Sequence, residues 1–169
     1  MLEPISLPQD TEWIVRVMKK SQENMIRYES CTQSILAAFM EEFKMEDPLV
    51  IRSAGAMHGG MLCSLTCGIH TAAMMVLGLL MGRDRLENGL DGLFPIVLPA
   101  QELMGRLIKK FGSHMCREIS GVVFTDMEQA MRFYASKENE KCVKLVAEGA
   151  EEIARFLKEL EQRGELFRV

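Results

Sequence analysis

The stretch GAMHGGMLCSLTCGIHTAAMMVLGLLMG, residues 55–82, joins a long apolar run to two cysteines and two histidines near its start. Residues 72–82 are apolar on nearly every side, which is typical of a helix enclosed by other helices. Thr66 can cap this helix, and the glycines ahead of it predict a loop. The stretch therefore predicts a buried central helix on which the rest of the chain packs.

Helical spacing of apolar residues continues on both sides of the central helix. No alternating pattern is long enough to build a sheet, and the best candidate, SGVVFTD, is too short. Further helices are expected after a cap at Asp10 or Thr11, over residues 28–43, from Pro48 to Arg52, from Pro99 to Phe111, over residues 126–134 and over residues 136–160. We predict one all-α domain over residues 1–169, a bundle of about five to seven helices around the central apolar helix, with an N-terminal helix within residues 1–27.

The bulk composition is that of an ordinary globular protein. Hydrophobic residues make up 48% and charged residues 26% of the 169 residues, and the net charge is −4. This acidic balance argues against a nucleic-acid partner and against an anionic membrane surface. The continuously apolar segment, residues 72–82, is too short to insert into a membrane, because spanning a bilayer takes ~20 residues. Since the N-terminus shows no basic and apolar leader pattern, we expect a cytoplasmic protein.

In the cytoplasm, five cysteines are expected to be free, catalytic or metal-binding rather than structural disulfides. Cys67 would occupy the first turn of the central helix, where unpaired N–H groups and the helix dipole lower the pKa of a thiol. His70, three residues later, lies on the same face. The pair could form a thiolate–imidazolium couple or a Cys-x-x-His metal clamp, and the plain alternative is a small buried cysteine beside a core histidine.

The other cysteines and histidines carry weaker signals. Cys63 and His58 lie ahead of the central helix, and His114 lies close to another cysteine further along the chain. Their spacing matches no zinc finger, zinc ribbon or haem attachment motif, so the roles of these residues stay open. Three further cysteines lie at apolar helical positions, and each one taken alone is typical of a core residue: Cys31, Cys116 and Cys142.

Four segments occur in a fixed order: SCTQSILAAF, AGAMHGGMLCSLTCGIHTAAMMVLGLLMG, KKFGSHMCREISG and KCVKLVAEGAEEI. In this combination the chain resembles the four-cysteine family called C_GCAxxG_C_C, whose members are described as redox-active proteins. The family pattern has a cysteine on an early helix, a Cys-Gly-Ala-x-x-Gly motif opening an apolar helix, a Phe-Gly-Ser-x-x-Cys segment and a last cysteine on the final helix. The resemblance covers residues 28–157, and the ordered combination is more specific than any single segment.

The resemblance implies a redox site at the entrance to the central helix, with Cys67 as its reactive member. The family's four cysteines correspond here to Cys31, Cys67, Cys116 and Cys142. The candidate cofactor-binding positions are Gly59, Gly60 and Gly68. The sequence departs from the motif at Ile69 and Ala72, where the family has Ala and Gly, and this departure weakens the case for a ligand that needs close backbone approach.

Three functions are consistent with this pattern. In the first, two of the four cysteines cycle between thiols and a disulfide, and attack comes from the thiolate with the lowest pKa, predicted to be Cys67. Sequence does not choose among the three pairings that four cysteines allow. In the second, the same four thiolates hold zinc, iron or an iron–sulfur cluster, with a histidine as a further ligand: His70 first, or else His58 or His114. In the third, the chain is an accessory protein of an oxidoreductase or transport system with inert cysteines.

The expected partners follow from these functions. Thiol chemistry needs no cofactor, and only the second function calls for zinc, iron or a cluster. A redox partner protein or a small-molecule ligand would exchange electrons with the cysteines. The apolar segment LFPIVLP, residues 93–99, is either a helix-packing loop or a contact in a homodimer.

Overall fold

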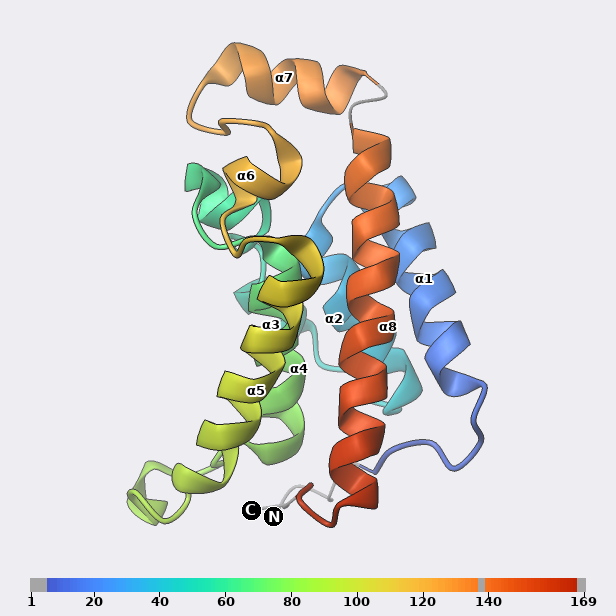
Figure 1. Ribbon diagram of the computed structural model, residues 1–169, viewed down its shortest axis with the longest axis vertical. Helices are drawn as coiled ribbons and strands as arrows, with labels where there is room; N and C mark the ends of the chain where they lie inside the picture. The colour runs from blue at the N-terminus through green and yellow to red at the C-terminus, as the bar shows by residue number, and fades with distance from the viewer. Residues whose placement is uncertain (1–5, 137–138, 167–169) are drawn as a thin grey trace.

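Helices dominate the described part of the chain (Figure 1). The computed structural model describes residues 6–136 and 139–166, and positions 137–138 of the expected last helix lie outside these residues. The described residues form eight α-helices: α1 Trp13–Tyr28, α2 Cys31–Glu42, α3 Pro48–Ser53, α4 Gly68–Met81, α5 Phe94–Phe111, α6 Cys116–Ser120, α7 Met127–Ala135 and α8 Glu140–Gln162. A π-helical turn, Gly60–Ser64, and a 3₁₀ turn, Leu86–Asn88, complete the described elements. The all-α class is confirmed.

Helix α4 is the central apolar helix that the sequence predicts. It packs against α2, α5 and α8, and Ala72, Val76 and Leu77 have no exposed surface. Because α4 carries no charged residue, every side of it can be covered by a neighbouring helix. The prediction of a central helix enclosed by others is confirmed.

The long helices alternate in direction, and this alternation decides where their ends meet. Helices α2, α4 and α8 run one way, whereas α1 and α5 run the opposite way (Figure 1). The N-termini of α2, α4 and α8 therefore lie at the same end of the molecule. We call α1, α2, α4, α5 and α8 the bundle body, and we call the start of α2, α4 and α8 together with residues 58–66 and 114–135 the cysteine end.

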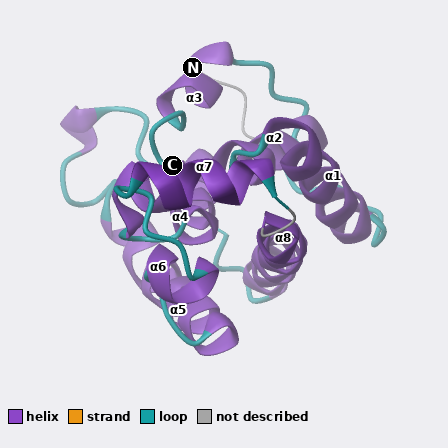
Figure 2. Ribbon diagram, turned by 90° about the horizontal axis from the view of Figure 1, so that it is seen from above, coloured by secondary structure: helices purple, strands orange, loops and turns teal. Residues whose placement is uncertain are grey.

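Short elements close the cysteine end. Figure 2, which views the molecule from that end, shows α7 lying across the bundle, with α6 beside it. The hydroxyl of Ser64 donates to the carbonyl of Val122 at 3.3 Å and accepts from the N–H of Phe124 at 2.6 Å. These two bonds tie the π-helical turn to the segment that leads into α7.

Hydrogen bonds also fix the start of α2 against the start of α4. The hydroxyl of Thr32 lies 3.2 Å from the carbonyl oxygen of Gly68 and 3.1 Å from the hydroxyl of Thr71. Thr32 is fully buried, so these bonds form away from competing water. The first turns of the two helices are thereby held in register.

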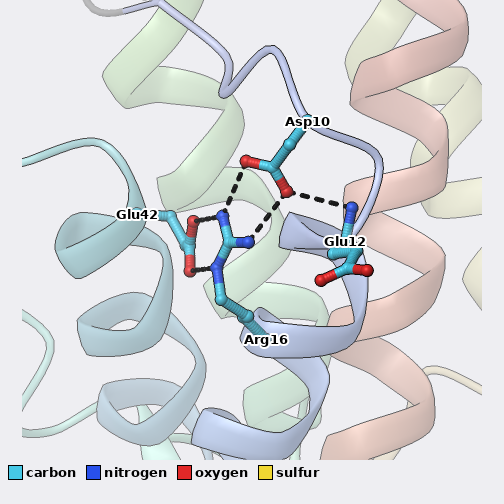
Figure 3. A network of polar contacts seen from close by, with 4 residues as sticks. All are labelled: Asp10, Glu12, Arg16 and Glu42. Carbon is cyan, nitrogen blue, oxygen red and sulfur yellow. Dashed lines mark hydrogen bonds and ion pairs between the residues drawn. The ribbon is translucent and has the colours of Figure 1, made fainter.

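A three-residue ion-pair network joins α1 to α2 on the surface (Figure 3). The guanidinium of Arg16 binds Asp10 at 2.8 Å and Glu42 at 2.7 Å, and the Asp10 carboxylate also accepts the N–H of Glu12. Asp10 therefore satisfies a backbone donor just before α1, although the helix cap itself is Glu12 rather than the expected Asp10 or Thr11. Such exposed pairs typically contribute less than about 1 kcal/mol each.

Several expected boundaries were wrong. The described residues contain eight α-helices rather than five to seven, because α3, α6 and α7 are separate short helices. Helix α5 begins at Phe94 instead of Pro99, since Pro95 supplies the proline in the first turn and Pro99 lies inside the helix. The LFPIVLP segment thus forms the start of α5, with Phe94 60% and Leu98 74% exposed. Helix α8 begins at Glu140, a few residues after the expected start.

None of the described helices combines the length and the apolar character that crossing a membrane requires. The prediction of no membrane-inserting helix agrees with this finding. The described residues form no strand, and their one β contact is an isolated antiparallel bridge between Thr66 and Met115.

Candidate functional site

The four cysteines singled out by sequence line one small cavity at the cysteine end. Its volume is about 30 Å³. Each sulfur comes from the start of a different helix: Cys31 is the first residue of α2, Cys67 the N-cap of α4, Cys116 the first residue of α6 and Cys142 the third residue of α8. The expected convergence of these cysteines is therefore present in the structure.

Helix N-termini surround the thiols with backbone N–H groups that have no partner inside the helix. The N–H groups of Gly59 and Thr32 bond to the sulfur of Cys31, and the N–H of Ile69 bonds to that of Cys67. Each of these bonds lowers the pKa of the thiol that accepts it, because it stabilises the thiolate. The helix dipoles add positive potential at the same place.

A short antiparallel contact holds Cys67 and Cys116 together. The N–H of Cys67 donates to the carbonyl of His114 at 2.8 Å, and the N–H of Cys116 donates to that of Leu65 at 2.5 Å. These two bonds flank the bridge between residues 66 and 115. Both cysteines are consequently fixed by backbone bonds between segments about fifty residues apart.

The thiols of Cys67 and Cys116 share a hydrogen bond, and this bond dominates their acidity. It lowers the pKa of Cys116, with a smaller contribution from the hydroxyl of Ser120, whose oxygen lies 3.8 Å from the sulfur. The same bond raises the pKa of Cys67, and burial raises that pKa further. The interaction therefore makes Cys116 the more acidic member of the pair.

This order reverses the expectation that Cys67 has the lowest pKa. Cys67 is the N-cap itself rather than the first-turn residue after a Thr66 cap, so it stands one position earlier than expected. It does accept the N–H of Ile69, but it lies between two other sulfurs, Cys31 and Cys116, whose negative charge would oppose its own. A thiolate is therefore better stabilised at Cys116 than at Cys67.

Cys31 and Cys142 form the more accessible half of the cluster. Both are partly exposed, whereas Cys67 and Cys116 are only 6% and 5% exposed. Burial is the main cause that raises the pKa of Cys31, and burial together with the neighbouring sulfurs raises that of Cys142 to about 12. Both side chains are therefore neutral thiols at neutral pH.

Two of the three candidate glycines pack against the cysteines, and the third packs against an aromatic ring of the cavity. A methyl group on Gly68 would overlap the sulfur of Cys31 and lie 2.6 Å from the hydroxyl oxygen of Thr32. A methyl group on Gly60, where φ is +65°, would lie 2.7 Å from Cβ of Cys116. Gly59, at φ +58°, lines the cavity next to the ring of Phe124. Gly60 and Gly68 therefore allow close packing of two of the cysteines, and cofactor binding at all three glycines stays a prediction.

The departure from the family motif at Ile69 has a structural counterpart. Ile69 is buried and lines the cavity, and its side chain contacts Gly149 of α8 directly. Because Gly149 has no side chain, α8 leaves space for the larger residue on α4. The departure at Ala72 is accommodated in the core, where that residue has no exposed surface.

The three histidines do not gather around the sulfurs. His58 is partly buried and lines the cavity, where burial lowers its pKa. His70 is fully buried outside the cavity, with its ring 6.2 Å from that of Phe111, and neither ring nitrogen has a hydrogen-bond partner. His114 is exposed and contributes its backbone carbonyl to the N–H of Cys67.

The metal-binding alternative requires a cluster of ligands. Within residues 6–136 and 139–166, no group of three or more His, Cys, Asp and Glu side chains is arranged to hold a metal ion. His70, the histidine assigned to that alternative, does not face the sulfurs. All five cysteines are free, and Cys63 is exposed on the π-helical turn away from the cavity.

Several cavity residues had no signal in the sequence. Phe124, Phe133 and Tyr134 from the region of α7 cover one side, and Glu29 from the end of α1 lies on another. The aromatic residues contact one another edge to face, with the rings of Phe124 and Phe133 5.3 Å apart. Burial is the main cause that raises the pKa of Tyr134 to about 12, and three of the sulfurs add to it. The sequence predicted a helix over residues 126–134, but not what that helix covers.

The sequence model of one protein family, described as "Putative redox-active protein (C_GCAxxG_C_C)", matches residues 29–156. The chain belongs to this family. The matched region contains all four cavity cysteines and most of the bundle body, so the C_GCAxxG_C_C match extends well beyond the cysteine motifs. Searches of curated proteins and of solved structures gave no match.

Proposed function

We propose that this C_GCAxxG_C_C protein performs two-electron thiol–disulfide chemistry, with Cys67 and Cys116 as the reacting pair. The observation that carries the proposal is the backbone bridge that holds Cys67 beside Cys116 in a shared cavity, where the two thiols influence each other's pKa. A thiol with a lowered pKa is the better nucleophile at neutral pH, and the second sulfur is already beside it. Of the three pairings that sequence leaves open, this one joins the two cysteines whose backbone segments the 66–115 bridge holds side by side.

Oxidation of the pair removes two electrons and two protons and forms one sulfur–sulfur bond. The bond requires Cα atoms within about 7 Å, and the backbone bridge between residues 66 and 115 keeps the two segments side by side. Reduction returns two electrons and two protons to the pair. No metal is needed for either direction.

Cys31 and Cys142 are suited to return these electrons. Attack by the sulfur of Cys31 on the oxidised pair would form a mixed disulfide and release one inner thiolate. Attack by Cys142 on the sulfur of Cys31 would then form the Cys31–Cys142 disulfide and release the second inner thiolate. Each exchange breaks one disulfide bond and forms another, so electrons balance. Their partial exposure supports the role, because a reducing partner can reach them.

The test is a redox titration of the purified protein in a dithiothreitol buffer series, followed by alkylation and peptide mass spectrometry. The expected result is a Cys67–Cys116 disulfide that forms reversibly and takes up two electrons on reduction. Cys67→Ala and Cys116→Ala should each abolish this transition, whereas Cys63→Ala, which changes an exposed cysteine outside the cavity, should leave it intact. If the inner pair never forms a disulfide at any potential, the proposal is wrong.

A parallel measurement addresses the metal alternative. Protein purified without air is analysed for zinc and iron and by visible spectroscopy. Stoichiometric metal that is lost in Cys67→Ala and Cys116→Ala would replace the thiol–disulfide proposal with a metal centre.

A further inference from the structure

The size of the cysteine cavity limits what can reach the inner thiols. A single water molecule needs about 10–15 Å³, so a volume of about 30 Å³ has room for two water-sized atoms side by side. A disulfide such as oxidised glutathione, or the loop of a partner protein, is many times larger. The inner thiols therefore favour a small reactant, because Cys67 and Cys116 are only 6% and 5% exposed and the cavity beside them is small.

Aromatic and aliphatic side chains form the cover of the cavity. Phe133 is 3% exposed, and its ring centroid lies 5.3 Å from those of both Phe124 and Tyr134. Met25 from α1 and Leu145 from α8 close other sides. Thiol–disulfide exchange depends on access to the sulfur, and the 5% exposed Cys116 offers little surface to an external disulfide.

The inner pair contains both groups that peroxide chemistry requires. Cys116 is the thiol more easily ionised, and Cys67 is the neighbouring thiol that can resolve an oxidised sulfur. The reactant must arrive between them, and both sulfurs line the same cavity.

We propose that the oxidant of this site is a hydroperoxide of the size of hydrogen peroxide. The cavity admits this small molecule and excludes larger hydroperoxides and disulfides. The inference rests on the proposed Cys67–Cys116 redox pair and adds the class of its oxidising substrate. Two oxygen atoms in contact match the available volume.

The first step breaks the O–O bond. The thiolate of Cys116 attacks one oxygen, forming a sulfenic acid, and hydroxide leaves. Cys67, which is hydrogen-bonded to Cys116, gives its proton to the hydroxide, so that water forms and Cys67 becomes a thiolate. The hydrogen bond between the two thiols thus places the required acid beside the leaving group.

The second step forms the disulfide. The Cys67 thiolate attacks the sulfur of Cys116, the S–O bond breaks, and the departing hydroxide takes up the proton that Cys116 lost to solvent. In total, two thiols and one hydrogen peroxide give one disulfide and two waters. Hydrogen peroxide is reduced by two electrons, and the pair of sulfurs is oxidised by two.

Cys63 offers an internal reference in the same chain. It is exposed and outside the cavity, so the cover does not affect reagents that approach it. The reduced protein is treated in separate samples with hydrogen peroxide, cumene hydroperoxide and oxidised glutathione, and each cysteine is followed over time by mass spectrometry. We expect hydrogen peroxide to oxidise Cys116 about tenfold faster than Cys63, and both bulky oxidants to modify Cys63 about tenfold faster than Cys116.

A variant of the cover sharpens the test. Phe133→Ala should raise the rate at which cumene hydroperoxide oxidises Cys116 by about tenfold, while the rate with hydrogen peroxide changes little. Met131→Ala is the matched control, because Met131 lies on the same helix and is 63% exposed. Circular dichroism checks that each variant is folded, and Tyr134→Ala replaces Phe133→Ala if the latter is not.

The outcomes separate the two proposals. If oxidised glutathione or cumene hydroperoxide oxidises wild-type Cys116 as fast as hydrogen peroxide does, size selection is wrong although the redox pair stands. If hydrogen peroxide oxidises Cys63 first, the substrate class is wrong. If no oxidant produces the Cys67–Cys116 disulfide, the proposed function itself fails.

Discussion

The bundle body and the cysteine end bury their side chains in different ways. In the body, large apolar residues such as Trp13, Phe39 and Phe156 have no exposed surface and meet other apolar groups. At the cysteine end, sulfurs, a histidine and hydroxyl groups surround a cavity of about 30 Å³. Non-glycine residues with left-handed φ also occur there, including Met61, Leu62 and Ser64 of the π-helical turn.

The difference indicates that the bundle body and the cysteine end have separate roles in stability and in thiol chemistry. The body supplies most of the buried apolar area and hence most of the free energy of folding. The cysteine end carries non-glycine residues with left-handed φ, which cost stability and persist only when the surrounding structure holds them. A substitution in the body should therefore change stability, whereas a substitution at the cysteine end should change thiol reactivity.

The largest expected effect on stability comes from removing a buried aromatic side chain from the bundle body. Phe156→Ala removes a fully buried ring that also lies under the guanidinium of Arg106 at 4.9 Å. We expect the free energy of unfolding to fall by about 3–5 kcal/mol, measured by urea denaturation. The rate of Cys116 alkylation under native conditions should stay near that of wild type, and a large change in this rate would contradict this separation of roles.

Acidic pH should lower the free energy of unfolding, because His70 is protonated more readily in the unfolded chain than in the folded one. Burial is the main cause that lowers its pKa to about 4 from an ordinary value of 6.5, and nearby His114 adds to the shift. The unfolded chain therefore binds a proton at higher pH than the folded one, so stability is complete above pH 6.5 and falls as the pH drops toward 4. The total loss should approach about 3 kcal/mol.

Urea denaturation of wild type and His70→Leu between pH 7 and 4 measures this effect. The difference in unfolding free energy between the two proteins should shift by this amount across the window. A parallel pH dependence in both would show that other groups are responsible.

Two glycines in the same helix should respond oppositely to alanine. At Gly68 the new methyl group overlaps the Cys31 sulfur, so we expect a loss of about 1–3 kcal/mol in unfolding free energy and altered Cys31 labelling. At Gly78 nothing lies within 4 Å of the new group, so a gain of about 0.5–1 kcal/mol is expected from the better helix propensity of alanine. Equal effects at both sites would contradict the close approach at Gly68.

The smallest expected effect concerns the acidity of Cys116. Cys67→Ala removes the hydrogen bond that lowers its pKa, so the pH profile of Cys116 alkylation should move to higher pH and the rate at pH 7 should fall severalfold. Cys63→Ala serves as the control and should not move the profile. An unchanged profile in Cys67→Ala would mean that the helix start and Ser120 set this pKa alone.

Sequence was sufficient for features that rest on local pattern. The helix over residues 68–81 is apolar on all sides, and such a helix can lie only inside a bundle. The four cysteines were identified from the family resemblance of their ordered segments. The properties of each position did not identify them, because each cysteine alone is typical of a core position. Their convergence followed from the family resemblance, and the structure explains it by the shared direction of α2, α4 and α8.

Features that depend on long-range contact could not be predicted. The pairing of Cys67 with Cys116 rests on backbone bonds to Leu65 and His114, and no local pattern reveals which segments meet. The order of the two pKa values depends on that pairing. The aromatic cover was missed for the same reason, because helix α7 is recognisable from its cap at Asp126 but its docking position is not.

The placement of the sulfurs at the starts of four helices has a consequence for biosynthesis. A nascent chain that has emerged only as far as α4 holds Cys31 and Cys67, but it lacks the segment around Cys116 that gives Cys67 its partner. The cavity closes only after α7 and the start of α8 have been translated and docked. Incomplete chains therefore carry separate, ordinary thiols, and the reactive pair arises at the same time as the finished fold.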